Sequence, residues 1–254
     1  MTRAAHVGRV ASRGAIAAAL VAAATGCGPE PIAATPGAMA GAPAFEVLST
    51  SAPAASASIR ADDLEPTAPG TQRWVEVDPG SGRPGEPFEV RTERGTGRVE
   101  RIDRSSQRTL VRDAAGAVLL AEQRDLDDGA VTRFVPPLLL APPTATAAEP
   151  WESESGVETR RGNAVDREGG RARRTASIRA AERIRTPLGT FDTLRVDSVI
   201  TMKVPFASMR RETSTWVRPG HGPVAVRSDE RILVMGIVPR DRRELRVRLP
   251  EGGR

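Results

Sequence analysis

Residues that could carry out acid–base or nucleophilic chemistry are few and scattered in this sequence. A hydrolytic site needs a base, usually histidine, beside its nucleophile, and beyond the first 26 residues the only histidine is His221. Asp127 and Asp128 fall in a turn, and Asp229 and Glu230 are strand neighbours whose side chains face opposite sides. Zinc sites need clusters of cysteine and histidine, and the chain has one cysteine. We therefore predict a noncatalytic protein with no metal and no cofactor.

A second group of residues could bind a ligand without transforming it. Trp151, Phe191 and Trp216 are large aromatic side chains in a chain that is only 3% aromatic. They could fill the core, or they could line a pocket for lipid or acyl chains. Arg218 and His221, close to Trp216 in sequence, would then form a polar rim for an anionic head group. The simpler interpretation assigns the aromatic residues to the core and the polar pair to a solvated turn.

These residues lie on or beside a run of predicted β-strands over 185–226. Apolar and polar side chains alternate nearly cleanly over 193–204, which indicates a half-buried strand. A proline and a glycine stand in each of the flanking segments 186–189 and 218–221, at positions that β-turns favour. The sequence thus predicts strands joined by tight turns around the candidate aromatic residues.

Short β-like segments separated by turn signals fill the chain from residue 71 to residue 250. Their close spacing predicts an antiparallel meander that closes toward a sandwich or barrel. Residues 136–150 interrupt this pattern, because their proline pairs disfavour a central strand, and their apolar side chains predict a covered loop. We predict one mainly β domain over 71–250.

The N-terminus has the pattern of an export signal. Three arginines precede an apolar run over 15–24, which is shorter than the roughly 20 residues that span a bilayer, so residues 1–26 are predicted to be a signal peptide. Cys27 follows, and its position resembles the lipobox of bacterial lipoproteins, although Ala24 stands where that family prefers leucine. The resemblance implies acylation of Cys27. The alternative is a plain signal peptide with an incidental cysteine.

Residues 27–70 are rich in proline, alanine, glycine and serine. Such a composition buries too little apolar surface to offset chain entropy, so it predicts a disordered tether. One short apolar stretch at 45–48 could dock on the domain or be inert. The net charge of +5 is modest and spread among many acids, and Lys203 is the only lysine. We therefore predict no nucleic-acid partner.

The order of several segments resembles a group of bacterial envelope proteins of unknown function. These segments are Pro-Pro-Leu-Leu-Leu at 136–140, Trp151, Pro-Leu-Gly-Thr-Phe at 187–191 and Trp-Val-Arg-Pro-Gly at 216–220. The resemblance covers roughly 131–230. It implies a curved antiparallel sheet similar to the half-barrel of periplasmic lipoprotein carriers, and it implies no known activity. It also favours a strand at 176–185, where the composition would equally allow a helix.

These observations predict a cell-envelope protein held to the membrane by a lipid anchor at Cys27. Gly28 follows the cysteine where an aspartate would suggest retention at the inner membrane, so the outer membrane, facing the periplasm, is the predicted location. One candidate function is binding of an apolar or amphiphilic envelope ligand such as lipid, in a dry cavity of several hundred Å³. The alternative is a structural or partner-binding module that contacts an envelope protein through an exposed sheet edge or apolar patch.

Overall fold

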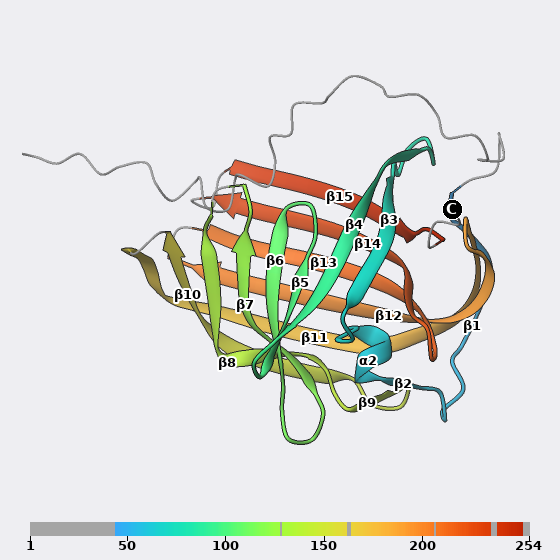
Figure 1. The fold of residues 1–254 in the computed structure, drawn as a ribbon, viewed down its shortest axis with the longest axis horizontal. Coiled ribbons are helices and arrows are strands. Elements are labelled where there is room, and N and C mark those ends of the chain that lie inside the picture. The colour runs from blue at the N-terminus through green and yellow to red at the C-terminus, as the bar shows by residue number, and fades with distance from the viewer. Residues whose placement is uncertain (1–43, 128, 162–163, 206, 235–237, 251–254) are drawn as a thin grey trace, which may run out of the picture.

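The structure is a computed structural model that describes residues 44–127, 129–161, 164–205, 207–234 and 238–250. Nearly all of its regular elements are β-strands (Figure 1). They are β1 (Glu46–Ser51), β2 (Ser58–Arg60), α2 (Ala61–Leu64), β3 (Gly70–Val77), β4 (Pro84–Gly95), β5 (Arg98–Ile102), β6 (Ser106–Arg112), β7 (Val118–Asp125), β8 (Val131–Ala141), β9 (Thr144–Thr146), β10 (Trp151–Arg161), β11 (Ala164–Thr186), β12 (Gly189–Val204), β13 (Ala207–Arg218), β14 (Gly222–Val234) and β15 (Val238–Arg248).

Twelve of the described strands, β3 to β8 and β10 to β15, form a closed antiparallel barrel. The ring follows the chain order and is closed by β15, whose residues 245–248 pair with residues 74–77 of β3. The prediction of a mainly β, antiparallel fold is therefore confirmed. The curved open sheet or half-barrel is wrong, because the β15–β3 pairing removes the free edges that an open sheet would have.

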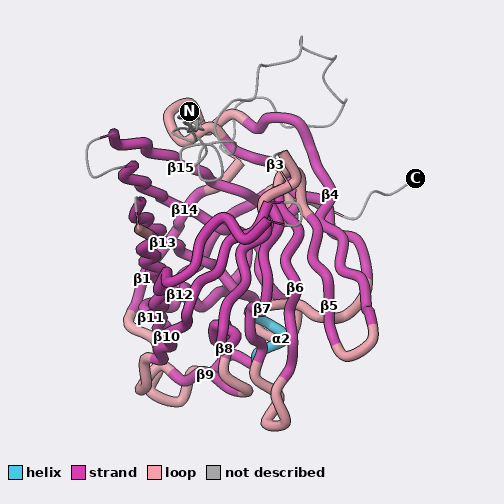
Figure 2. Tube along the Cα trace, turned by 90° about the vertical axis from the view of Figure 1, so that its left-hand side faces the viewer, coloured by secondary structure: helices cyan, strands magenta, loops and turns pink. Residues whose placement is uncertain are grey.

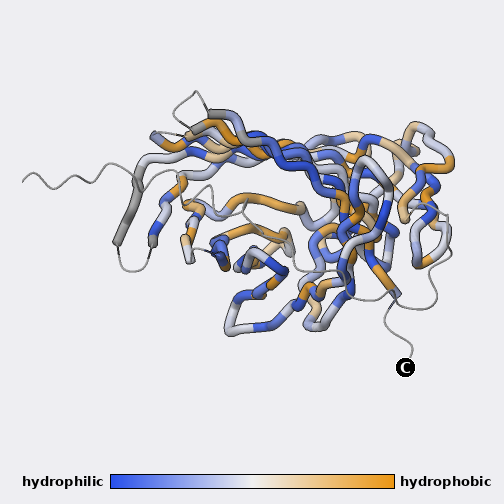
Figure 3. Tube along the Cα trace, turned by 90° about the horizontal axis from the view of Figure 1, so that it is seen from above, coloured by the Kyte–Doolittle hydropathy of each residue, from blue (hydrophilic) through white to orange (hydrophobic). Residues whose placement is uncertain are grey.

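The barrel is flattened into two layers. The long strands β11 to β15 run across the view in Figure 1, and β3 to β8 cross in front of them at a steep angle. Figure 3 shows the same two layers from above. Residues 193–204 belong to β12, as their alternation predicted, and residues 176–185 belong to β11, so the strand interpretation of this segment is correct.

An apolar plug fills one end of the barrel. β2 and β9 pair into a small second sheet, and α2 directly follows β2. Ile59 and Leu64 of this segment are buried in one cluster with Leu110, Leu138 and Val217 of the barrel strands. Figure 2 shows α2 near that end of the strands. Glu65 directly follows α2 and pairs with two arginines of the barrel wall that are described below.

Part of the range 27–70, predicted as a disordered tether, is folded. β1, β2 and α2 all lie within it, and β1 pairs with residues 181–185 of β11. Phe45 packs edge-on against Trp216, with 4.8 Å between the ring centroids. The apolar stretch at 45–48 therefore docks on the barrel, because Trp216 and its apolar neighbours need a cover there. The signal peptide, Cys27 and the tether up to residue 43 lie outside the described residues.

The covered loop predicted at 136–150 is also wrong in its first part, where Pro136 and Pro137 lie within β8. The prolines are accommodated because the ladders are interrupted around them. β7 pairs with residues 131–133 and 138–141 but skips the residues between, and β10 pairs only with 131–135. A proline in a strand is tolerated where no partner needs its missing N–H group.

Candidate functional site

The space enclosed by the barrel strands, here called the lumen, holds a cavity of about 250 Å³. Charged residues from both layers line it: Arg101, Asp103, Arg108, Glu230, Glu244 and Arg246. Apolar side chains line it as well: Trp74, Val90, Leu120, Leu140, Ile200 and Val226. The cavity is therefore mixed in character, and the dry apolar cavity that a purely apolar ligand would need is not what the lumen provides.

Strand alternation brings the charged residues to the lumen. Arg242, Glu244 and Arg246 are two residues apart along β15, so all three point to the same face of the sheet. The intervening Leu245 and Val247 point outward and pack in an apolar cluster with Trp216. Ala44 and Phe45 belong to the same outer cluster, so the apolar residues of β15 are covered from outside. The charged face of β15 is the one that lines the cavity.

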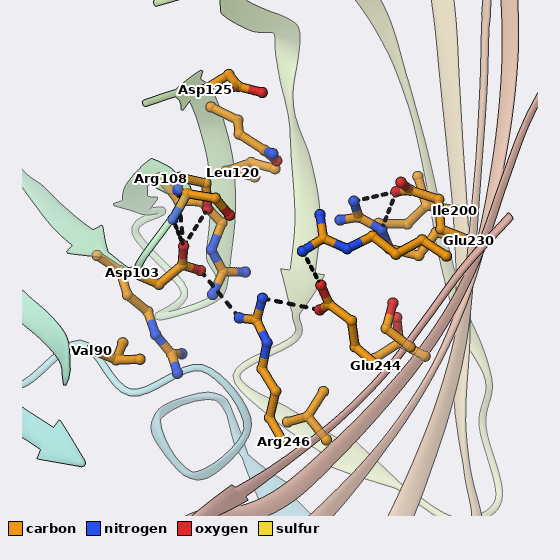
Figure 4. A pocket seen from close by; sticks show the side chains of 18 of the residues that line it. Val90, Asp103, Arg108, Leu120, Asp125, Ile200, Glu230, Glu244 and Arg246 are labelled. Atoms are coloured by element: carbon orange, nitrogen blue, oxygen red, sulfur yellow. Dashed lines mark hydrogen bonds and ion pairs between the residues drawn. The ribbon is translucent and has the colours of Figure 1, made fainter. Parts of the chain in front are cut away.

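Arg246 bridges two acidic residues across the lumen (Figure 4). Its guanidinium lies 3.4 Å from Oδ2 of Asp103 and 3.0 Å from Oε2 of Glu244, which also pairs with Arg242. Burial raises the pKa of Asp103, but Arg246 and two backbone N–H donors outweigh it, so the pKa lies below its ordinary value. Asp103 is thereby held as an anion at neutral pH.

Arg101 and Arg108 form a like-charged pair that faces the cavity. They are directly opposite each other on β5 and β6, an arrangement that is unfavourable for two cations. Both share one carboxylate, since Oε2 of Glu65 lies 3.3 Å from Arg101 and 3.8 Å from Arg108. Desolvation, and next the charge of Arg108, lower the pKa of Arg101 to about 10. Two guanidinium groups therefore share one ion-pair partner at this point of the wall, and the charge of Asp103 acts on both from farther away.

A further buried guanidinium lies close to this pair. Arg174 on β11 donates to the backbone oxygen of Leu139 at 3.2 Å and lies 5.9 Å from the ring centroid of Trp151. Desolvation lowers its pKa to about 10, while Glu65 raises it and Arg108 lowers it further. On the other wall Arg211 has its own carboxylate, because its Nε donates to Glu230 at 2.6 Å. The guanidinium groups of Arg101, Arg108 and Arg174 thus all interact with the one carboxylate of Glu65.

None of the five ligand-binding residues predicted from the sequence lines the lumen cavity. Trp151 is buried in the core, where its indole N–H donates to the oxygen of Leu140 at 3.2 Å. Trp216 lies on the outer face and donates to the buried carboxylate of Glu182 at 2.6 Å. Both tryptophans are therefore placed as the simpler interpretation expected, with their rings packed in apolar clusters.

The other three predicted residues lie near one end of the β12–β13–β14 surface. Arg218 stacks over the ring of Phe191 at 5.0 Å, so these two are brought together, away from the lumen. His221 is exposed in the turn after β13, with Nδ1 3.3 Å from the oxygen of Pro219. It borders a depression that Asp62 and Arg248 also line.

Sequence reasoning missed the charged residues of the lumen, although one signal for them was present. Arg101 and Arg108 stand on the two arms of a short hairpin, and residues 244–248 alternate charged with apolar side chains. Both patterns are usually interpreted as solvent-facing surface. Only the closure of the barrel turns those faces inward.

Among the described residues no group of three or more His, Cys, Asp or Glu side chains is placed to hold a metal ion. Within the same residues no helix is both long and apolar enough to cross a bilayer. The predictions of a noncatalytic, metal-free protein remain predictions.

Comparison with known proteins does not assign a function to this chain. No protein-family model matches the chain, and no curated protein matches it in sequence. A predicted lipoprotein of Parabacteroides distasonis aligns with 14% identity and a TM-score of 0.37, over 72% of this chain and 95% of that one. A predicted exported protein of Bacteroides fragilis, described as having a YmcC-like fold, aligns with 12% identity and a TM-score of 0.29, over 73% and 96% of the two chains. Scores this low carry no inference about function.

Proposed function

We propose that this chain is a lipid-anchored protein of the cell envelope whose barrel binds an amphiphilic ligand in its lumen without transforming it. The observation that supports the proposal is the cavity of about 250 Å³, because apolar and charged side chains both line it. Ligand sites combine an apolar lining with a few placed polar groups in this way. The cavity is slightly smaller than the roughly 300–1,000 Å³ of typical ligand sites, which favours a small amphiphile or one short chain of a larger one.

The proposed absence of catalysis follows from the partners of the candidate groups. His221 is exposed, and its ring Nδ1 lies 3.3 Å from the backbone oxygen of Pro219. The lumen arginines and carboxylates form ion pairs with one another, so in this proposal the carboxylates do not act as general bases. Replacing His221 with alanine is expected to leave every function of the protein intact.

The proposed anchor rests on the sequence alone. The arginine-bearing start, the short apolar run and Cys27 suit an acylated N-terminus on the outer membrane. The described part of the chain begins at residue 44, and 16 residues lie between it and Cys27 in the sequence. A coil of that length spans roughly 20–25 Å, which would keep the barrel close to the membrane surface.

Blocking the lumen tests the binding function directly. Thr213 lines the cavity, and Thr213→Trp should fill it and remove any amphiphile that copurifies with the full-length protein, as seen by native mass spectrometry. Thr201→Trp is the matched control, because Thr201 points to the opposite face of the neighbouring strand β12. Wild type that carries no ligand from solubilised envelope, or Thr213→Trp that carries as much as wild type, would contradict the proposal.

A second candidate, a partner-binding module, is favoured by β1. In the described part of the chain β1 pairs with β11 on one side only, and Val47 and Leu48 on it are 41% and 38% exposed. An unpaired edge with apolar side chains is a template for another strand. Leu48→Lys should then abolish capture of a stoichiometric envelope protein while leaving amphiphile carry-over unchanged.

A further inference from the structure

We infer that Arg101 and Arg108 form an anion site in the lumen, and that the amphiphile carries a carboxylate or phosphate head group bound there. This inference rests on the proposed function and adds the chemical class of the ligand. The observation behind it is a pair of guanidinium groups, opposite each other on neighbouring strands, that face one cavity and share a single carboxylate.

The charge balance of the lumen singles out this pair. Arg246 has two carboxylate partners, and Arg211 donates to Glu230. By contrast, Arg101 and Arg108 divide Glu65 between them, at 3.3 and 3.8 Å. Asp103 and Asp125 are the other carboxylates that line that side. Asp103 acts on both arginines through its charge, but its ion pair is with Arg246 and it accepts hydrogen bonds from the N–H groups of its own turn.

The pair is also poorly solvated. The side chain of Arg101 is 11% exposed and that of Arg108 is 26% exposed, so water stabilises neither charge well. Guanidinium groups present paired N–H donors in a planar fork that fits carboxylate and phosphate oxygens. An entering anion would therefore gain charge-assisted hydrogen bonds where the protein supplies too few acceptors.

The apolar side chains that line the same cavity indicate that the anionic group is attached to an apolar chain. Trp74, Val90 and Val226 form an apolar cluster together with Phe88, and the first three of these line the same cavity as the arginines. Arg246 spans the region between them, with its guanidinium 5.4 Å from the ring centroid of Phe88 and its buried Nε without a hydrogen-bond partner among the described residues. A short alkyl chain with an anionic end matches a cavity that is lined by both cationic and apolar side chains.

The experiment compares four small probes on the full-length protein in phosphatidylcholine nanodiscs, by isothermal titration calorimetry against empty nanodiscs. Hexanoate and hexyl phosphate carry the two head groups, hexanol lacks the charge, and inorganic phosphate lacks the chain. The anionic amphiphiles should bind more tightly than hexanol and more tightly than inorganic phosphate. The ratio of hexanoate to hexyl phosphate affinity distinguishes a carboxylate ligand from a phosphate ligand.

Three variants assign the site to the pair. Arg108→Gln should weaken binding of the preferred anion by about tenfold or more, the usual effect of losing a charge-assisted hydrogen bond. Arg98→Gln is the matched control, because this exposed arginine on β5 makes the same charge change outside the lumen. Glu65→Gln should strengthen anion binding several-fold, since it removes the carboxylate that competes for both guanidinium groups. If Arg108→Gln does not fold, Arg108→Lys replaces it in the experiment. This variant keeps the positive charge but loses the paired N–H donors of the guanidinium, so it should also bind the anion more weakly than wild type.

The outcomes separate this inference from the function on which it rests. Hexanol binding as tightly as the anions, or weaker anion binding in Glu65→Gln, would overturn the anion site and leave lumen binding intact. Inorganic phosphate binding as tightly as hexyl phosphate would keep the anion site and reject an amphiphile. No binding of any probe would overturn the anion site, and the native mass spectra of wild type and Thr213→Trp would then decide the proposed function alone.

Discussion

Replacing Glu182 with alanine should destabilise the barrel far more than removing any exposed carboxylate. The Glu182 side chain is 2% exposed and joins three strands at one point. It accepts a hydrogen bond from Trp216 at 2.6 Å, from Arg195 at 2.7 Å and from Thr50 of β1 at 3.3 Å. Its loss leaves the buried indole N–H without a partner, which costs about 1–3 kcal/mol. Arg195 is 30% exposed and can turn to water, so its lost ion pair adds only about 1 kcal/mol.

The free energy of unfolding should therefore fall by about 3 kcal/mol in Glu182→Ala. Urea unfolding followed by tryptophan fluorescence measures it, and an unchanged urea dependence would show that the native state keeps its compactness. For a domain of this size the melting temperature should drop by about 6–12 °C. Hydrogen exchange in β1 should also rise, because Thr50 loses its contact.

Glu152→Ala is the matched control for this prediction. Glu152 is 62% exposed and pairs with Arg173 at 2.8 Å, so its removal should cost no more than about 1 kcal/mol. Glu182→Gln should be intermediate, since the amide oxygen can still accept from Trp216 while the charge facing Arg195 is gone. Equal destabilisation in the two alanine variants would refute the view that Glu182 fastens β1, β11 and β13 together.

Three further predictions concern other parts of the chain. The pKa of Asp103 is lowered in the folded protein, so its stabilising contribution is present above the unfolded pKa, near 3.8, and is lost as the pH falls through the folded pKa. Asp103→Asn should therefore lower the free energy of unfolding at neutral pH and weaken its dependence on pH in acid, as measured by urea unfolding. The exposed variant Asp192→Asn should change neither quantity. Gly170→Ala should cost about 1–3 kcal/mol, because a Cβ there would lie 2.9 Å from Cγ1 of Val204, whereas Gly80→Ala, with its nearest contact at 3.5 Å, should be tolerated. Cys27→Ser should abolish metabolic labelling by a fatty-acid analogue, and a wild-type protein that stays unlabelled would remove the anchor.

The secondary structure could be predicted from the sequence because it depends on neighbouring residues. The alternation over 193–204 and the turns on either side of it are local patterns, and the structure places β12 and its turns there. The turns and alternation allowed a sandwich or a barrel, but the two strands that close the barrel could not be predicted, because β15 meets β3 across more than 160 residues of chain. No local pattern records which two strands become neighbours at such a distance.

The candidate site could not be predicted for a related reason. Alternation on β15 separates Glu244 and Arg246 from Leu245 and Val247, but it does not state which face is inside. The usual expectation turns the apolar face inward and leaves the charged face in water. Here the apolar face is covered from outside by the segment at 44–45, itself expected to lie in a tether, so one error about the N-terminal segment led to the other.

The energetics of the lumen favour a ligand over a purely structural role for its charges. Desolvating an ion pair costs about as much as the pair returns, and apolar replacements of such pairs are often neutral or stabilising by about 1–4 kcal/mol. A barrel selected for stability alone would therefore be expected to fill the space around Arg246 with side chains such as those of the plug at its other end. The strain is greatest at Arg101 and Arg108, where burial and mutual repulsion act on the same two groups and one carboxylate serves both. A bound anion would turn that destabilising arrangement into binding affinity, which is a physical reason for such a pair to exist inside a barrel.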